Sequence, residues 1–343
     1  MEHPGQRGPA DPRAPASSLR GADDQPIPAR SIGGSGLKDG EHIRSAEAAA
    51  ETAESLVESM IGDHVDLSMP NKPDVPLTTS AVLSVRGLSR TGAFDDVSFD
   101  VRAGEIVGLA GLMGSGRSEV LRAIFGADHP KGEVKVDGLP VRLTHPRHAM
   151  KRGIGMVPES RKDQGLVMGR PIRDNVTLAS LPKHSRCGFV ARRKEALTTE
   201  MLSNQLDVRT LDGEAPVLAL SGGNQQKVLF AKWIAFGARV LLIDEPTRGV
   251  DVGAKAVIHQ LIADIAATGV AVVLVSSEHE EVVGLAHRVL VMRRGRVIEE
   301  LTGDDVSEDR VVQAALGAAA GGLSLRDQHP HNYEDLKFRE EVS

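Results

Sequence analysis

The sequence is poor in cysteine and in aromatic residues. Its 343 residues include one cysteine, Cys187, so no intramolecular disulfide can form and a reducing compartment is expected. Aromatic residues make up 3% of the chain, with one tryptophan and one tyrosine, which argues against stacking platforms for single-stranded nucleic acid. The net charge of −6 gives no sign of a broad basic face. We therefore expect no nucleic-acid partner.

Long hydrophobic runs are also lacking. No apolar stretch approaches the ~20 residues that a helix needs to cross a bilayer. The start of the sequence has no compact apolar core typical of a signal peptide. Hydrophobic residues nevertheless make up 41% of the chain, enough for a sizeable core. These features predict a soluble protein that works at a membrane only through a partner.

The two ends differ in composition from the middle of the chain. Residues 1–45 are rich in Gly, Pro, Ala, Arg and Asp without a hydrophobic period, which predicts disorder. Within residues 46–80, a short helix from Ala46 to Ile61 is predicted before a proline-rich extended linker. Residues 321–343 are polar and predict a flexible tail.

Residues 81–320 show the pattern of an α/β domain. Short runs that partly alternate apolar and polar residues, such as 82–86 and 97–101, predict an antiparallel patch near its start. Continuous apolar runs at 240–243 and 270–275 predict buried strands, and an amphipathic helix lies between them. Residues from about 159 to 236 have few strand signals and predict a helical region.

A glycine-rich segment at 111–118 follows an apolar strand pattern and precedes a helix pattern. Strand, glycine-rich loop and helix form the context that a phosphate-binding loop requires. Backbone N–H groups and the helix N-terminus can then face phosphate oxygens. The usual lysine is replaced by arginine, which keeps the charge but is larger and planar. The nucleotide-binding candidates are Gly111, Gly114, Ser115, Gly116, Arg117 and Ser118, and the Ser118 hydroxyl suits Mg²⁺.

Two carboxylates follow the predicted strand 240–243. The carboxyl end of a parallel strand is where ligands bind in such sheets. Asp244 suits Mg²⁺, which prefers oxygen ligands, and Glu245 suits positioning or deprotonating an attacking water. Taken alone, the pair could equally cap a helix.

A third motif opens the helix predicted over 221–236. The segment Leu220–Lys227 begins with a serine and two glycines, so a hydroxyl and N–H groups could face an anion. An ordinary serine N-cap is the alternative interpretation.

In this order and at this spacing, the three motifs resemble an ATP-binding cassette. The resemblance covers about residues 81–317 and implies a P-loop NTPase core of RecA-like, mostly parallel sheet, with an antiparallel β subdomain and a helical subdomain. Five segments together are similar to the second cassette of duplicated ATPase subunits of bacterial monosaccharide importers: 111–118, 157–162, 220–227, 244–255 and 276–278. Residues 56–62 are similar to the end of the first cassette in that family.

Four positions depart from cassettes in general. The loop lysine is Arg117, a usual glutamine is Glu159, and the usual histidine of the switch position is Ser277. No aromatic residue precedes Phe94 to stack on adenine; Phe94 itself is expected in the core, and His279 on the surface. In this importer class the second cassette usually carries the first three changes, which implies an asymmetric pair of sites with slow turnover at this one.

The resemblance implies ATP and Mg²⁺ as ligands, with Ser118 and Asp244 holding the metal and Glu245 catalytic. It places Glu159 at this chain's own nucleotide. The segment that reaches a partner's nucleotide would comprise Ser221, Gly222, Gly223 and Gln225. Residues 246–251 resemble the D-loop, with Asp251 at the subunit junction.

The implied partners are another cassette, the transmembrane permease subunits and, indirectly, a periplasmic or extracellular sugar-binding protein. The segment 159–166 and the helical region to about 215 are expected to face the permease. The implied location is the cytoplasmic face of the cell membrane, as a peripheral protein.

Two other functions remain open at this point. A cassette of DNA repair or translation would carry coiled-coil insertions or a basic face, and neither is evident. A nucleotide-binding regulatory or vestigial fragment without turnover fits the four altered positions. The sequence does not identify the sugar.

Overall fold

The computed structural model describes residues 33–38, 41–47, 68–75, 80–186, 188–209 and 212–317. The chain divides into two compact units, Met1–Asp63 and His64–Ser343.

In the first unit, an antiparallel hairpin pairs β1 (Gly33–Lys38) with β2 (Glu41–Glu47). This differs from the disorder predicted for residues 1–45. The intervening Asp-Gly dipeptide is a strong hairpin signal, which the composition of the surrounding segment obscured. Ala46 and Glu47 belong to β2, so the predicted helix does not begin there; its remaining residues lie outside the described part of the chain.

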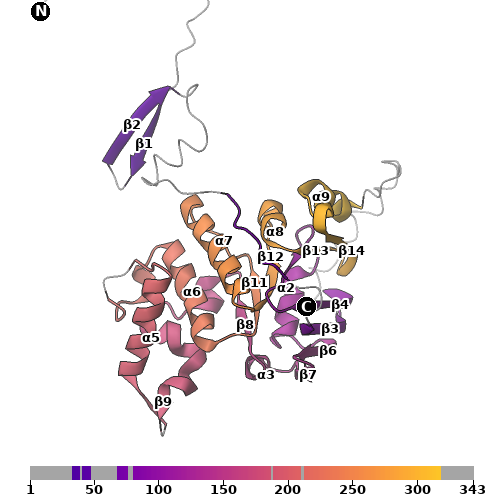
Figure 1. Cartoon of the computed structure of the whole chain (residues 1–343), viewed down its shortest axis with the longest axis horizontal. Helices are drawn as coiled ribbons and strands as arrows, with labels where there is room; N and C mark the ends of the chain where they lie inside the picture. Colours follow the sequence, from indigo (N-terminus) through magenta and orange to yellow (C-terminus); the bar gives the residue numbers. More distant parts are fainter. Residues whose placement is uncertain are drawn as a thin grey trace, which may run out of the picture. The chain divides into compact units, whose positions relative to one another are not determined.

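The second unit is built around a six-stranded sheet (Figure 1). Five strands are parallel and β14 is antiparallel to β13 at one edge. From that edge the strands are β14 (Arg296–Thr302), β13 (Arg288–Arg293), β5 (Ile106–Ala110), β12 (Ala271–Val275), β11 (Val240–Asp244) and β8 (Ile154–Val157). The predicted α/β fold with a mostly parallel sheet is confirmed.

A second, antiparallel sheet confirms the predicted β subdomain. Its order is β4 (Phe94–Arg102), β3 (Ala81–Arg90), β6 (Lys131–Val136) and β7 (Leu139–Pro140). Asp137 and Gly138 join the last two strands with φ angles of 49° and 75°. Positive φ at both turn positions matches the twist of the strands it connects.

The helices fall into two groups. Those that follow strands of the large sheet or lie beside it are α2 (Arg117–Ile124), α3 (Pro146–Lys151), α7 (Val252–Ala267), α8 (His279–Leu285) and α9 (Glu308–Leu316). The predicted helical region contains α4 (Ile172–Thr177), α5 (Arg192–Gln205) and α6 (Gly222–Phe236), with the two-residue strands β9 (Ser185–Arg186) and β10 (Phe189–Val190). Within this unit, Figure 1 shows the helical region and the antiparallel sheet at opposite ends of the central sheet.

Shorter helical turns complete this unit. A π turn spans Arg161–Gly165, and 3₁₀ turns span Leu178–His184, Val217–Ala219 and Gly303–Asp305.

Both faces of the large sheet are buried. Successive side chains of a strand point to opposite faces. In β11, Leu241 and Ile243 pack with α6 and α7, whereas Val240 and Leu242 pack with the antiparallel sheet. This explains the continuous apolar run, which is typical of parallel strands covered on both sides.

The stretch 68–75, part of the predicted linker, has no regular secondary structure and contacts α8. Lys72 Nζ donates to the carbonyl oxygens of Val283 and Ala286 at 2.9 and 2.7 Å. These carbonyls lie at the C-terminal end of α8, where a cation is favourable.

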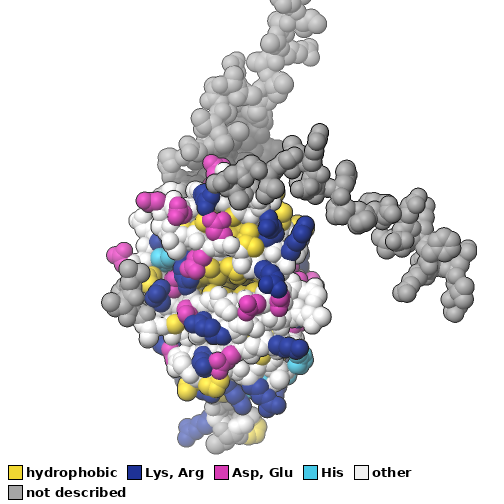
Figure 2. Space-filling view, turned by 90° about the vertical axis from the view of Figure 1, so that its right-hand side faces the viewer, with side chains coloured by type: hydrophobic (Ala, Val, Ile, Leu, Met, Phe, Trp, Pro, Cys, Tyr) yellow, Lys and Arg dark blue, Asp and Glu magenta, His cyan; other side chains and the backbone are white. Residues whose placement is uncertain are grey.

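No helix in the described ranges is long and apolar enough to cross a membrane. Figure 2 shows Lys and Arg side chains interspersed with Asp and Glu over the face it presents, rather than gathered in one basic patch.

Candidate functional site

A cavity of about 650 Å³ brings together most of the predicted site residues. It lies at the loop between β5 and α2 and reaches the segments after β11 and β12. The predicted residues that line it are Gly114, Ser115, Gly116, Arg117, Ser118, Glu159, Glu245 and Ser277. Other lining residues come from the loop 247–250, and Lys255 and Glu278 form an ion pair at 2.6 Å there.

The loop backbone is held in a conformation that needs glycine. Gly116 has φ 98° at the N-cap of α2, and a Cβ there would lie 2.8 Å from the carbonyl oxygen of Ala93. The buried Ser115 Oγ, although it lines the cavity, has no hydrogen-bond partner within the protein. A buried hydroxyl without a partner is costly, so a polar ligand in this loop would stabilise it.

Arg117 turns toward the end of a neighbouring strand. Its Nη1 donates to the carbonyl oxygen of Ser276, just after β12, at 2.7 Å. Burial lowers the pKa of Arg117, and the carboxylates of Glu245 and Asp244 oppose that effect. The side chain is thus a buried cation between the loop and the two acids.

Ser118 and Asp244 form an oxygen pair beneath the loop. Ser118 Oγ donates to Asp244 Oδ1 at 2.9 Å. Burial raises the pKa of Asp244 to about 6, while the Ser118 hydrogen bond and Arg117 oppose the shift. In the described part of the chain no three His, Cys, Asp or Glu side chains cluster as metal ligands. Two protein oxygens fit Mg²⁺, which usually completes its shell with phosphate and water oxygens.

Glu245 lies at the mouth of the cavity in a left-handed conformation, with φ 49°. Its N–H donates to the carbonyl oxygen of Val275 in the neighbouring strand at 2.9 Å. Its Oε2 accepts a hydrogen bond from Ser277 Oγ at 2.9 Å. An uncommon backbone conformation, fixed by β12, therefore aims this carboxylate.

The other predicted segment lies away from this cavity. Ser221 is exposed and caps α6, with its Oγ accepting from the N–H and Nδ2 of Asn224 at 3.4 and 3.0 Å. Asp251 is exposed and caps α7 through the N–H of Ala254 at 2.9 Å. Gln225 is buried, and its Nε2 donates to the Leu220 carbonyl at 2.9 Å. Its side chain is thus engaged within this chain.

Two arginines at this site were not singled out from the sequence. Arg248 forms an ion pair with Glu159. Arg161 Nε donates to Gln225 Oε1 at 3.2 Å, and its other nitrogens bond the carbonyls of Arg248 and Gly249. Arg161 stands inside the segment 157–162 that carries the family resemblance, but only the fold brings it to residues more than 60 positions away.

The segment 89–92 before Phe94, which lacks the aromatic residue that would stack on adenine, borders a second cavity of about 710 Å³ beside Gly114. Phe94 is 3% exposed and packs in the core, as predicted. The cationic side chains of Arg90, Lys131 and Arg294 line this cavity instead, together with His129. His279 is half-buried, and its Nδ1 is buried without a partner, so the prediction of a surface residue is only partly right.

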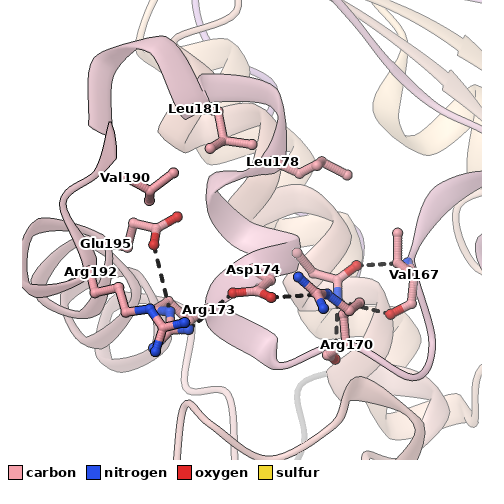
Figure 3. Close-up of a pocket in the computed structure, with 10 residues that line it drawn as sticks. Val167, Arg170, Arg173, Asp174, Leu178, Leu181, Val190, Arg192 and Glu195 are labelled. Atoms are coloured by element: carbon pink, nitrogen blue, oxygen red, sulfur yellow. Dashed lines mark hydrogen bonds and ion pairs between the residues drawn. The ribbon is translucent and has the colours of Figure 1, made fainter. Parts of the chain in front are cut away.

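A third cavity, of about 330 Å³, lies in the helical region between α4 and α5 (Figure 3). Its apolar side chains are Val167, Leu178, Leu181 and Val190. Arg173 forms ion pairs with Asp174 at 3.1 Å and with Glu195 at 3.8 Å, and thereby links the two helices. Arg170 pairs with Asp174 at 3.1 Å.

Residues 94–248 match the family model described as ABC transporter. The chain is 45% identical over 285 residues to the ribose import ATP-binding protein RbsA of Rhodococcus jostii, and 47% identical over 285 residues to RbsA 1 of Streptomyces coelicolor. A putative ribose/galactose/methyl galactoside import ATP-binding protein of Rhizobium meliloti is 44% identical over 286 residues. Each match covers 83% of this chain but only 56 to 57% of the relative, so the chain spans just over half of their length.

Solved structures with low sequence identity share the fold. The post-hydrolysis dimer of the ATP-binding cassette MJ0796 bound to ADP and Pi matches with a TM-score of 0.54 at 22% identity, over 64% of this chain and 98% of that one. The ADP conformation of the cassette MJ1267 matches with a TM-score of 0.57 at 20% identity, over 69% of this chain and 96% of that one. The phosphate-loop architecture and the relatives agree: this chain contains an ABC transporter ATP-binding cassette, related to the ribose and galactose import ATP-binding proteins.

Proposed function

We propose that this chain is the ATP-binding and ATP-hydrolysing subunit, or half subunit, of a bacterial carbohydrate importer. The observation that carries the proposal is the Ser118–Asp244 oxygen pair, 2.9 Å apart, beneath a glycine-rich loop and beside Glu245. Relatives named for ribose and galactose import support the substrate class.

The roles of the residues follow from their positions. N–H groups of the loop from Gly111 to Ser118 bind the phosphates, and Arg117 supplies positive charge. Ser118 and Asp244 would hold Mg²⁺, which would neutralise the charge that develops on the phosphates. Glu245 orients and deprotonates the attacking water, and the Ser277 hydroxyl holds its carboxylate.

A second cassette completes the mechanism. Ser221, Gly222 and Gly223 would contact a partner's nucleotide. The exposure of Ser221 at the N-cap of α6 supports this contact, whereas Gly223 is buried in the single chain. Asp251 lies at the same junction. The partner is a second copy of this chain or a first-type cassette, and this chain corresponds to the second cassette of its longer relatives. The substitutions at Arg117, Glu159 and Ser277 support that correspondence.

The segment 159–166 and the cavity of the helical region form the proposed permease contact (Figure 3). Leu178 and Val190 are 45% and 44% exposed there, and Phe189 is 81% exposed. Exposed apolar side chains rimmed by charge are typical of protein-binding surfaces. This contact would hold the chain on the cytoplasmic face of the membrane and couple nucleotide-driven cassette closure to sugar uptake.

The test is ATP hydrolysis by the purified chain beside Glu245→Gln, with ATP binding measured on both. Hydrolysis that the substitution abolishes would support a working enzyme that pairs with itself. Binding by both proteins without hydrolysis by either would favour a half subunit that needs a partner, or the second candidate: a nucleotide-binding regulatory or vestigial cassette. The second candidate is supported by Arg117, whose guanidinium is engaged by the Ser276 carbonyl. Absence of ATP binding would refute both.

A further inference from the structure

We propose that Arg161 is a positioning residue that joins the D-loop to α6, so that Ser221 and Asp251 keep a fixed spacing. The role of Arg161 within this chain does not depend on the proposed function. Only its consequence, the presentation of Ser221 and Asp251 to a partner cassette, rests on that function.

The guanidinium of Arg161 uses all three nitrogens. Nη1 donates to the Arg248 carbonyl at 3.0 Å and Nη2 to the Gly249 carbonyl at 3.1 Å. Nε donates to Gln225 Oε1 at 3.2 Å, in the first turns of α6. One planar group thus connects two successive carbonyls of the D-loop with the helix that Ser221 caps. The ordered fork of arginine suits such a bridge, whereas a lysine ammonium lacks this geometry.

The turn that carries Arg161 is itself attached to α6. The Ser160 side chain caps this turn at the N–H of Asp163. At its other end, Lys232 Nζ donates to the Gly165 carbonyl at 2.6 Å, and a Cβ on Gly165 would lie 3.0 Å from Leu229 Cδ2. The Gly165 end of the turn is therefore tied to α6, and Arg161 near the other end bonds both Gln225 of α6 and the D-loop.

The close approach of these elements also requires glycine at the start of α6. A Cβ on Gly222 would lie 2.7 Å from Arg161 Nη2 and 3.2 Å from the Gly249 carbonyl oxygen. A side chain at this position would push the guanidinium away from its acceptors. Gly222 thus has a function within this chain in addition to its proposed contact with a partner's nucleotide.

The acceptors of Arg161 are neutral. They are two backbone carbonyls and an amide oxygen, while the nearby carboxylate of Glu159 pairs with Arg248. Burial lowers the pKa of Arg161. Replacing the guanidinium would leave three acceptors without their donor, so the D-loop and the start of α6 would loosen together.

The experiment compares amide hydrogen exchange of the full chain with that of Arg161→Ala, Arg161→Lys and the control Arg310→Ala. Arg310 is placed in α9 and pairs with Glu299, outside all three cavities. In Arg161→Ala we expect at least fivefold faster exchange both at residues 248–252 and at 222–226, with a smaller change in Arg161→Lys. The exchange of α2 and the dissociation constant for ATP should stay within twofold.

Kinetics supply the second readout. Where the chain turns over ATP, Arg161→Ala should lower kcat at least fivefold and leave KM for ATP within twofold, because the chain's own phosphate loop is intact. Exchange that is unchanged in both segments, that rises throughout the domain, or that is normal in Arg161→Lys would overturn the proposal. If the wild-type chain binds no ATP, the proposed function fails, yet the exchange experiment still decides the role of Arg161.

Discussion

The hydroxyl of Ser277 donates a hydrogen bond to Glu245 Oε2 over 2.9 Å. The two residues follow the neighbouring parallel strands β12 and β11, whose registered ends bring them together. In place of the usual histidine, the chain therefore has a short neutral donor on the proposed catalytic carboxylate. The serine hydroxyl can orient the carboxylate. Unlike a histidine, it cannot take up a proton and place a positive charge beside the negative charge that develops on the phosphate.

We expect Ser277→Ala to reduce the rate of ATP hydrolysis about threefold to tenfold. The lost hydrogen bond contributes about 1 kcal/mol, and 1.4 kcal/mol corresponds to a tenfold change in rate. ATP affinity should not change, because Ser277 contacts Glu245 rather than the phosphate loop. The matched control is Ser307→Ala at the start of α9, where the serine side chain makes no capping hydrogen bond. Equal rates for Ser277→Ala and wild type would show that Glu245 does not depend on this hydroxyl.

Asp244→Asn is expected to stabilise the chain without nucleotide at pH 7.5. Burial raises the pKa of Asp244 to about 6 from its ordinary 3.8, so the folded state binds the proton more tightly than the unfolded state. The ionised side chain thus costs stability at pH values above 6, and the cost disappears below pH 4. The shift corresponds to at most about 3 kcal/mol.

Urea unfolding at pH 7.5 and pH 4 measures this effect, with exposed Asp304→Asn as the control. A gain for Asp244→Asn at pH 7.5 that vanishes at pH 4 is the expected result. An equal gain at both pH values would contradict the assigned origin in ionisation.

Mg²⁺ should compete with protons at Asp244. The metal requires the ionised carboxylate, so the affinity for Mg–ATP is expected to fall about tenfold for each pH unit below 6. ATP binding with EDTA should be weaker and nearly independent of pH in this range. Calorimetric titrations at pH 5, 6 and 7.5, each with Mg²⁺ or EDTA, provide the comparison. An affinity for Mg–ATP that is constant from pH 5 to 7.5 would argue against Asp244 as a ligand.

The phosphate-loop region could be predicted because its signals are local. The apolar run before Gly111, the glycines of the loop and the amphipathic helix after Ser118 each specify their own structure. The end of the cassette was predicted less completely. Helix α9 was not predicted, although Ser307 and Gly317 are residues typical of the two helix caps that they form.

Contacts between segments that are far apart in the sequence could not be predicted from such local signals. Arg161 donates a hydrogen bond to the buried Gln225, and the sequence alone does not bring these two residues together. Likewise, the orientation of Arg117 toward Ser276 depends on the pairing of β12 with β5, which composition and periodicity do not specify.

The buried Lys232 should make the free energy of unfolding rise with pH in alkaline solution. Burial lowers the pKa of Lys232 to about 8 from its ordinary 10.5, while its Nζ donates to Gly165 and lies 5.0 Å from the Trp233 ring centre. Between pH 8 and 10.5 the unfolded chain holds a proton that the folded chain has released, so stability rises with pH. Relative to Lys232→Met, the wild-type free energy of unfolding should gain up to about 3 kcal/mol across this window.

Urea unfolding of both proteins at pH 7, 8, 9 and 10 measures that difference, and exposed Lys194→Met serves as the control. Parallel curves for wild type and Lys232→Met would mean that Lys232 titrates as it does in the unfolded chain.

Arg117→Ala and Arg117→Lys separate the charge of this side chain from its shape. The alanine variant removes the buried cation between the loop and the two acids, so ATP affinity should fall at least tenfold, since a charge-assisted contact to phosphate contributes about 1.5–3 kcal/mol. The lysine variant restores a point charge that can reach the phosphates, and its affinity should lie within about threefold of wild type or exceed it. Arg122→Ala, which removes a guanidinium bonded to Asp128 outside the cavity, is the matched control. If Arg117→Ala binds ATP as tightly as wild type, the guanidinium serves only the Ser276 carbonyl, and phosphate binding at this loop depends on backbone N–H groups alone.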